Sequence, residues 1–365
     1  MESLSLSIQM ACKTISNLVN RNGINSIPPS PQPDSVSSSN EKTETNTVTD
    51  EQYDLRLNSM KRLDEVSTNV LRNALRFTGK LQMVKPAQDP MDGDENGTSE
   101  VFESGPAQHQ PGVLIAQALD DKYVAYFDPL DGSGNADAAI CSGTVFGIFE
   151  TDDKEEDDKN KESKTKEGTD EKIDVNINAV LQPGKNLVAA GYCLYSSATI
   201  LVFTLGEGTH GFTLDPQINE FVLTHPNIRI PSRGNVYSTN EANSEWWADD
   251  LKSYVRALKT GENETDERYA LRYVGSMVGD IHRTLMYGGI FFYPSDSKYH
   301  PNGNLQLLYK SAPMSYVIEQ AGGKSTNGKR GLLDVKPERV HERSPCFIGS
   351  PEDIEEMKTY IAHEE

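Results

Sequence analysis

Apolar side chains at the start of the chain recur at every third or fourth position, which is the spacing of one face of an α-helix. This row predicts a first helix that Gly23 can end. A second row with the same spacing predicts another helix that ends before Gly79. The first row consists of Leu4, Ile8, Cys12, Ile15 and Val19, and the second of Met60, Leu63, Val66, Val70 and Ala74.

The pattern changes at Tyr123, where short apolar runs with the composition of strands begin. YVAYF and TVFGIF come first, and GYCLYSSATILVFTLG, HGFTL and EFVLTH follow with the turn sequences GEGTHG and DPQIN among them. Strands joined by turns of this kind are typical of antiparallel hairpins. We therefore predict that GYCLYSSATILVFTLG, HGFTL and EFVLTH form a meander, and that YVAYF and TVFGIF are strands before it.

Helical patterns return in the last third of the chain. Residues 246–258, 277–287 and 313–320 are predicted helices, and the last of them ends before Gly322. Residues 350–353, Ser-Pro-Glu-Asp, have the form of a capping box with proline at the first helical position, which predicts a final helix toward Ile361. Interleaved strands and helices predict an α/β (α+β) fold in stacked layers.

Three stretches of the chain are polar: 27–50, 86–112 and 152–172. Such segments bury too little apolar surface to offset their chain entropy, so we predict loops or disordered insertions. A regulatory tether is the alternative for 152–172. Within the second stretch, residues 92–103 fit the spacing of a calcium-binding loop, but the prolines around them disfavour the flanking helices of an EF-hand, so an acidic loop is favoured.

The composition narrows the classes of function. The chain has 35 Lys and Arg against 55 Asp and Glu, a formal charge of −20, which argues against binding to duplex nucleic acid but does not exclude a phosphorylated small molecule. No apolar stretch is long enough to span a membrane, and the N-terminus lacks a secretory signal. We therefore expect a cytoplasmic protein. The four cysteines form no CxxC pair and are expected to be buried thiols in a reducing compartment.

The segment Asp128-Pro-Leu-Asp131-Gly-Ser-Gly-Asn135 directly follows the predicted YVAYF strand. Two carboxylates three residues apart on a proline turn can converge on one hard cation, with the Leu130 carbonyl as a further oxygen ligand. The glycines let backbone N–H groups approach a phosphate. An ordinary polar turn is the alternative. By its spacing, the segment favours a site for a metal and a phosphate.

This segment resembles the DPxDG(S/T) signature of the metal-dependent sugar-phosphate and inositol-phosphate phosphatases. The longer run KYVAYFDPLDGSGNADAAICSGTVFGIF is similar to the class I fructose-1,6-bisphosphatase family in particular. The likeness continues through AAGYCLYSSAT, VYSTNE, LRYVGSMVGDIHRTLMYGGIFFYP, LLYKSAPMSYVIEQAGG and IGSP. It covers most of the chain outside the polar stretches.

The resemblance implies a five-layer αβαβα sandwich that forms a homotetramer. It also implies a reaction in carbohydrate metabolism, such as gluconeogenesis: Mg²⁺-dependent hydrolysis of the 1-phosphate of fructose 1,6-bisphosphate or a related sugar bisphosphate. It implies an N-terminal metal and 1-phosphate domain over 1–217 and a C-terminal sugar-phosphate domain over 218–365. A plastid location is possible by the same likeness if a transit peptide is missing. The matched residues imply metal ligands at Asp128, Leu130, Asp131 and Glu100, and catalytic roles for Asp128, Asp131 and Asp64. They imply contacts with the 1-phosphate at Ser133 and Gly134, and with the 6-phosphate at Asn240, Tyr273 and Tyr293. Met277 matches a sugar contact, and Arg272 matches an arginine that reaches the site of a neighbouring subunit.

The chain departs from the family pattern at chemical positions. Lys310 stands where the family has a glutamate metal ligand. Further departures replace a lysine by Asn304, a tyrosine by Asn243, a helix aspartate by Asn69, and one glutamate of an adjacent pair by Val101. They leave open the alternative of a catalytically impaired homologue that binds sugar phosphate or joins hetero-oligomers.

Lys310 is the most consequential of these departures. A charge of +1 about 4 Å from Mg²⁺ costs about 8 kcal/mol at an effective dielectric of 20, whereas a millimolar metal site is worth only about 4 kcal/mol. Either Lys310 turns to solvent and a weaker metal site survives on Asp128 and Asp131, or its ammonium replaces the metal's charge. The sequence leaves both open.

Overall fold

The structure, a computed structural model, describes residues 2–21, 63–75, 81–84, 114–118, 123–136, 138–150 and 181–361. The predicted loops at 27–50, 86–112 and 152–172 lie outside the described residues, as does the calcium-loop pattern at 92–103.

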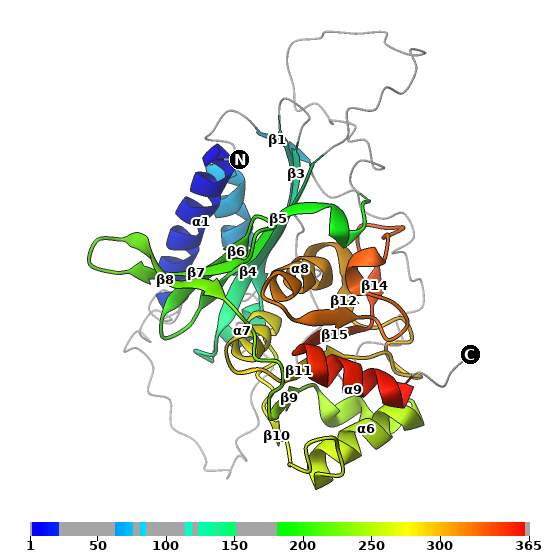
Figure 1. The fold of residues 1–365 in the computed structure, drawn as a ribbon. Coiled ribbons are helices and arrows are strands. Elements are labelled where there is room, and N and C mark those ends of the chain that lie inside the picture. Colours follow the sequence, from blue (N-terminus) through cyan, green and yellow to red (C-terminus); the bar gives the residue numbers. More distant parts are fainter. Residues whose placement is uncertain are drawn as a thin grey trace, which may run out of the picture.

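An eight-stranded sheet forms the first half of the molecule (Figure 1). Its strands follow one another in chain order, and each is antiparallel to the next. The predicted meander is therefore confirmed. The strands are β1 (Leu81–Val84), β2 (Leu114–Ala118), β3 (Tyr123–Asp131), β4 (Ser142–Glu150), β5 (Leu187–Tyr195), β6 (Thr199–Thr204), β7 (Thr209–Asp215) and β8 (Glu220–Ile228).

A five-stranded sheet forms the second half, in the order β10-β9-β11-β15-β13. β10, β9 and β11 are parallel, whereas β15 is antiparallel to both of its neighbours. The strands are β9 (Val236–Ser238), β10 (Ala270–Leu271), β11 (Ile290–Tyr293), β13 (Lys324–Thr326) and β15 (Cys346–Gly349); a separate pair joins β12 (Leu305–Gln306) to β14 (Arg343–Ser344).

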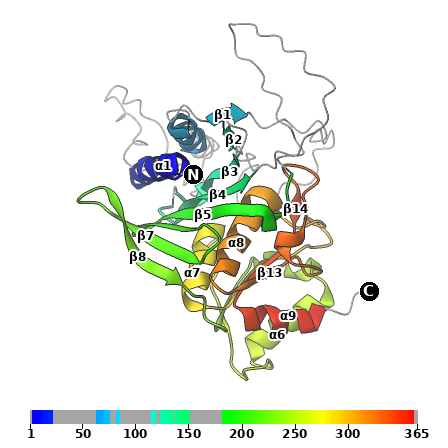
Figure 2. The ribbon, with the colours of Figure 1, turned by 45° about the horizontal axis from the view of Figure 1, so that its top comes forward.

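Helices cover both sheets on both faces, and the two views agree on their placement (Figures 1 and 2). The first helix and the helix over 63–75 lie on the outer face of the large sheet, two helices lie between the sheets, and two cover the outer face of the small sheet. The helices on the outer face of the large sheet are α1 (Glu2–Asn20) and the 63–75 helix. Those between the sheets are α7 (Met277–Tyr287) and α8 (Ala312–Gln320), and those on the outer face of the small sheet are α6 (Asp249–Thr260) and α9 (Pro351–Ile361). Short turns complete the fold: α4 (Ser133–Ala136), η1 (Gly184–Asn186), η2 (Glu241–Trp246), η3 (Leu307–Ser311) and η4 (Leu332–Asp334).

Three apolar cores lie between these layers. One lies between α1, the 63–75 helix and the large sheet, a second holds α7 and α8 between the sheets, and a third packs α6 and α9 on the small sheet. β3 and β4 are buried almost throughout because both of their faces are covered. The layer order is αβαβα, as predicted. Within the described residues, no helix is both long and apolar enough to cross a bilayer.

The predicted helices are present, with small shifts at their ends. The helix predicted to begin at Trp246 is divided, because η2 ends there and α6 begins at Asp249. In the 63–75 helix the most buried row is Leu63, Ser67, Leu71 and Leu75, while the predicted Val66, Val70 and Ala74 lie beside it, half-buried.

The final helix begins at Pro351 as predicted, but its first residues also connect different parts of the fold. Ser350 Oγ accepts a hydrogen bond from Gly289 N at 3.0 Å. Asp353 accepts one from Gly234 N at 2.9 Å and one from the Tyr269 hydroxyl at 2.6 Å. The side chains expected to cap α9 thus fix it to the loops before β9 and β11.

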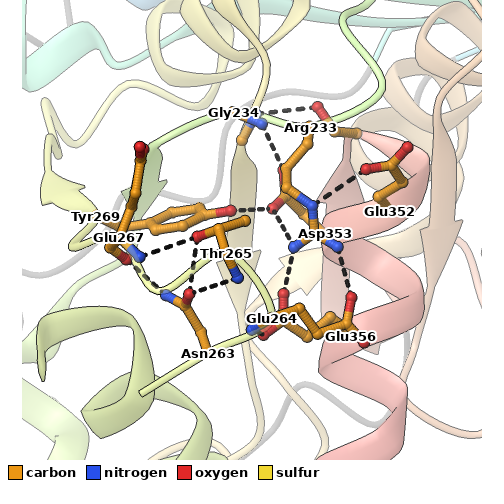
Figure 3. A network of polar contacts seen from close by, with 12 residues as sticks. Arg233, Gly234, Asn263, Glu264, Thr265, Glu267, Tyr269, Glu352, Asp353 and Glu356 are labelled. Atoms are coloured by element: carbon orange, nitrogen blue, oxygen red, sulfur yellow. Dashed lines mark hydrogen bonds and ion pairs between the residues drawn. The ribbon is translucent and has the colours of Figure 1, made fainter. Parts of the chain in front are cut away.

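Arg233 occupies the centre of this junction (Figure 3). Its guanidinium contacts Glu356, lies 3.1 Å from Glu352 and 3.7 Å from Asp353, and donates to Glu264 at 2.7 Å. Glu356 and Asp353 are buried, so the arginine compensates charges that water does not reach. This cluster joins α9 to the segments on either side of α6.

The remaining expectations concern the four cysteines and the boundary between the two domains. Cys12, Cys193 and Cys346 are buried free thiols as expected, but Cys141 is only half-buried because it lies in the turn before β4. The division at residue 217 stays a prediction; it falls in the turn between β7 and β8, and β8 pairs with β7 in the large sheet.

Candidate active site

The two aspartates of the DPLDG segment lie at the end of β3, and both face the same side. Residues three apart in a regular strand point to opposite faces. Here the β3–β4 pairing shifts between Asp128, which pairs with Val145, and Asp131, which pairs with Gly143. This bulge inserts an extra residue and turns the second carboxylate toward the first. Thr144 Oγ1 holds the turn by donating to the Pro129 carbonyl at 2.7 Å.

The side chain between the two carboxylates is Lys310. Its Nζ lies 3.0 Å from Asp128 Oδ2 and 2.9 Å from Asp131 Oδ1, and the lysine side chain is only 13% exposed. Burial lowers the pKa of Lys310, but the two carboxylates outweigh it and raise the pKa above its usual value, so the lysine carries its charge. Burial raises the pKa of Asp128, and Lys310 opposes this rise. The alternative in which Lys310 turns to solvent is therefore wrong.

A π-helical turn places Lys310. η3 precedes α8 directly, and its residues Leu307, Leu308 and Tyr309 are buried in the core between the sheets. A π turn widens the helix by one residue and often occurs at functional sites. With its neighbours fixed in the core, Lys310 projects from this turn toward the end of β3.

The start of α7 contacts the second aspartate from the other side. Asp131 Oδ2 accepts hydrogen bonds from Val278 N at 3.3 Å and Ser276 Oγ at 3.5 Å. Gly132 has φ +72, and a β-carbon there would lie 3.1 Å from that of Ser276. The turn after Asp131 needs glycine for both reasons. The aspartate pair is thereby joined to the segment 274–278.

A buried pair in α7 that the sequence analysis missed positions this segment. Asp280 accepts hydrogen bonds from Val274 N at 3.0 Å and Gly275 N at 3.1 Å. Arg283 Nη2 donates to Asp280 at 2.7 Å and to the Arg272 carbonyl at 2.7 Å. Burial raises the pKa of Asp280, and Arg283 opposes this. The signal in the sequence was an Asp and an Arg three residues apart in a largely apolar helix.

The residues assigned to the 6-phosphate lie at one edge of the small sheet. β10, β9 and β11 run parallel, and Tyr273, Asn240 and Tyr293 follow or end these strands in turn. The carboxyl ends of parallel strands meet at the same edge, which is where ligands bind in open α/β sheets. Asn240 also caps η2 by accepting from Ala242 N at 3.1 Å. Residues 274–278 connect this edge to Asp131.

Asp64, on the 63–75 helix, reaches the same site from the outer layer. Burial is the main cause that raises its pKa to about 7; a hydrogen bond from Ser133 lowers the pKa and the charge of Asp128 raises it. A carboxyl group with a pKa near 7 can hold or release a proton near neutral pH. The 63–75 helix, β3 and α4 thus bring Asp64, Asp128 and Ser133 together.

The other predicted residues have varied surroundings. The Leu130 side chain is buried in the outer core, and Met277 is buried at the start of α7. Gly134 lies in α4 beside Ser133, and Arg272 is exposed, with its Nη1 donating to the Leu271 carbonyl at 2.8 Å. Glu100 and Val101 lie outside the described residues. Asn69 is exposed and accepts from Arg72, Asn243 is buried, and Asn304 accepts from Arg343.

Comparisons with known proteins place the chain in a family. Models of the N-terminal and C-terminal domains of fructose-1,6-bisphosphatase match residues 108–226 and 230–362. The chain is 40% identical to chloroplastic fructose-1,6-bisphosphatase 1 of Arabidopsis thaliana, over 98% of this chain and 75% of the relative. The chain belongs to the fructose-1,6-bisphosphatase family.

Two other members of this family bear on the fold and the compartment. The chain is 43% identical to cytosolic fructose-1,6-bisphosphatase of Arabidopsis thaliana, over 84% of this chain and 78% of the relative. The crystal structure of Leishmania major fructose-1,6-bisphosphatase in holo form matches with a TM-score of 0.72 and 31% identity, over 98% of this chain and 93% of that one. The family and the five-layer fold expected from the sequence are confirmed.

The metal implied by the family does not fit the residues at the centre of the site. The ammonium of Lys310 lies within hydrogen-bonding distance of both carboxylates that would coordinate the ion. Among the residues that the structure describes, no three His, Cys, Asp or Glu side chains gather so that they could hold a metal ion. A fructose-1,6-bisphosphatase scaffold here surrounds a lysine-bridged pair of aspartates.

Proposed function

We propose that the protein is a sugar-bisphosphate phosphatase that removes the 1-phosphate of fructose 1,6-bisphosphate. The observation that carries this proposal is the connection between two places suited to phosphate. The turn after Asp131 is one, the edge with Asn240 and Tyr293 is the other, and residues 274–278 join them. The named relatives support the same activity and do not favour the impaired homologue.

In this proposal each part of the site has a separate task. The turn at Ser133 and Gly134 holds the phosphate that is cleaved, and Asn240, Tyr273 and Tyr293 hold the other phosphate through amide and hydroxyl donors. Asp64, with its pKa of about 7, takes a proton from the water whose oxygen attacks the phosphorus, and returns it to the sugar oxygen that leaves as its bond to phosphorus breaks. Mg²⁺, expected from the resemblance, has no part in these steps, because Lys310 takes its place between the aspartates.

Phosphate release from fructose 1,6-bisphosphate by the full-length chain tests the proposal. Tyr293→Phe and Asn240→Ala should raise KM about tenfold or more, because each removes a phosphate donor worth about 1.5–3 kcal/mol. Tyr287→Phe is the matched control, since Tyr287 is 73% exposed at the end of α7. Fructose 1-phosphate, which lacks the second phosphate, should respond little to Tyr293→Phe. Equal losses with both substrates, or no phosphate release at any concentration, would contradict the assignment.

The assembly and the compartment belong to the same proposal. Leu271 at the end of β10 and the next two residues, Arg272 and Tyr273, are exposed, which supports a homotetramer in which Arg272 reaches a neighbouring subunit's site. Arg272→Ala should then raise KM without changing the mass measured by light scattering. The named relatives include chloroplastic and cytosolic proteins, and we keep the cytoplasm as the proposed compartment, with the plastid as the alternative.

A further inference from the structure

Lys310 meets the same two oxygens that a divalent cation would need. Its Nζ donates a charge-assisted hydrogen bond to Asp131 Oδ1 at 2.9 Å and forms an ion pair with Asp128 Oδ2 at 3.0 Å. Mg²⁺ bonds to oxygen at about 2.0–2.1 Å and requires nearly octahedral ligands. An ion bound to both carboxylates would sit in the space of the ammonium, so the two cannot be present together.

The surroundings of Lys310 hold it in this position. Leu307, Leu308 and Ser311 of η3 are buried, and the lysine side chain itself is 13% exposed. Asp131 is fixed by Val278 N at 3.3 Å on its other oxygen, so the carboxylate cannot rotate toward a new ligand without losing that bond. A metal could enter only if the lysine left a nearly closed site.

The charges lead to the same conclusion. Asp128, Asp131 and Lys310 together carry a formal charge of −1, whereas a glutamate at position 310 would give −3 and a glutamine −2. Affinity for a divalent cation rises with the number of anionic oxygen ligands. The present set is thus the least suited of the three to bind a metal.

We propose that Lys310 is the resident cation of this site, an ammonium built into the chain that binds Asp128 and Asp131 in place of a divalent metal ion. The aspartate pair is then organised without metal. The inference does not rest on the proposed function, because it concerns cation binding in the absence of substrate.

Titration of the full-length chain with Mn²⁺, followed by electron paramagnetic resonance, tests this proposal. Lys310→Glu should bind Mn²⁺ at least a hundredfold more tightly than the parent at its strongest site, and Mg²⁺ should compete. Adding Asp131→Asn to Lys310→Glu should remove the gain. Lys185→Glu is the control, because it places a glutamate beside Asp334 in an exposed pair and should leave Mn²⁺ binding as in the parent.

Lys310→Gln provides a second test that does not add a carboxylate. It should bind Mn²⁺ about tenfold more tightly than the parent, and Mn²⁺ should raise its melting temperature but not that of the parent. Circular dichroism shows which variants are folded. The proposal is overturned if the parent already binds Mn²⁺ tightly through Asp131, or if folded Lys310→Gln gains no affinity. Phosphate release is measured separately, so failure of the proposed function would leave this result unchanged.

Discussion

Replacing Arg233 by methionine tests whether the cluster in Figure 3 stabilises the fold. Methionine retains an apolar side chain of similar reach but removes the charge that faces Glu356 and Asp353. Those carboxylates are 2% and 0% exposed, so neither can recover its lost partner from water. Removing one partner of a buried ion pair costs about 3–5 kcal/mol. We expect about 3 kcal/mol, since Asp353 keeps its hydrogen bond from Tyr269 at 2.6 Å.

The destabilisation caused by Arg233→Met should also depend on pH, and its direction follows from the pKa of Asp353. Burial is the main cause that raises the pKa of Asp353 from 3.8 to about 6, and Arg233 is among the groups that lower it. A carboxyl group whose pKa is raised by folding contributes stability that is present below its unfolded pKa and is lost as pH rises through its folded pKa. Without Arg233 the folded pKa of Asp353 rises further. The destabilisation by Arg233→Met should therefore be large at pH 8 and smaller at pH 5.

Urea unfolding at pH 5 and pH 8 measures both effects. Lys185→Met is the control, because the Lys185–Asp334 pair is 3.2 Å long with both side chains more than half exposed, and such pairs are worth about 0–1 kcal/mol. The reasoning is refuted if the two variants are destabilised equally, or if the loss caused by Arg233→Met is as large at pH 5 as at pH 8.

Two further predictions concern the site. Folding raises the pKa of Asp64 to about 7, so its contribution to the free energy of unfolding is present below about pH 4 and is lost as the pH rises through 7. Asp64→Asn should therefore flatten this decline of stability with pH in unfolding experiments. Gly143→Ala would place a β-carbon 2.7 Å from both the Cys193 carbonyl and Val278 Cγ1. Such overpacking costs about 1–3 kcal/mol, and a crystal structure should show Val278 displaced from Asp131.

Periodicity predicted the helices and strands and their buried faces well, because it reports which side of each element is covered, whereas the five-layer order came from the family resemblance. The rows through Leu4 and Ile8 and the apolar runs at β3 and β4 are buried where they were expected. Helix ends were less predictable, since they depend on tertiary contacts. Ser350 and Asp353 have the pattern of a cap, yet both bond to other loops, because Gly289 N and Gly234 N lie within reach only after folding.

The sequence suggested candidates for the site but not its geometry. The spacing of Asp128 and Asp131 indicated a shared target, but the bulge that turns both to one side results from pairing with β4. The direction of Lys310 depends on the π turn of η3, for which the sequence carries no reliable signal. Asp280 was missed because its partners are backbone N–H groups of a neighbouring loop.

The long blocks shared with fructose-1,6-bisphosphatases consist largely of residues that pack the layers together. β3 and β4 are buried along nearly their whole length, and residues of η3 and α8 fill the core between the sheets. Likeness over such blocks is therefore strong support for the fold, because packing needs many apolar positions. The chemistry depends on few positions, and Lys310 is one of them. Since Lys310 lies on the same buried turn that aligns α8, the family scaffold can remain intact while the cation between Asp128 and Asp131 changes from a metal ion to an ammonium group.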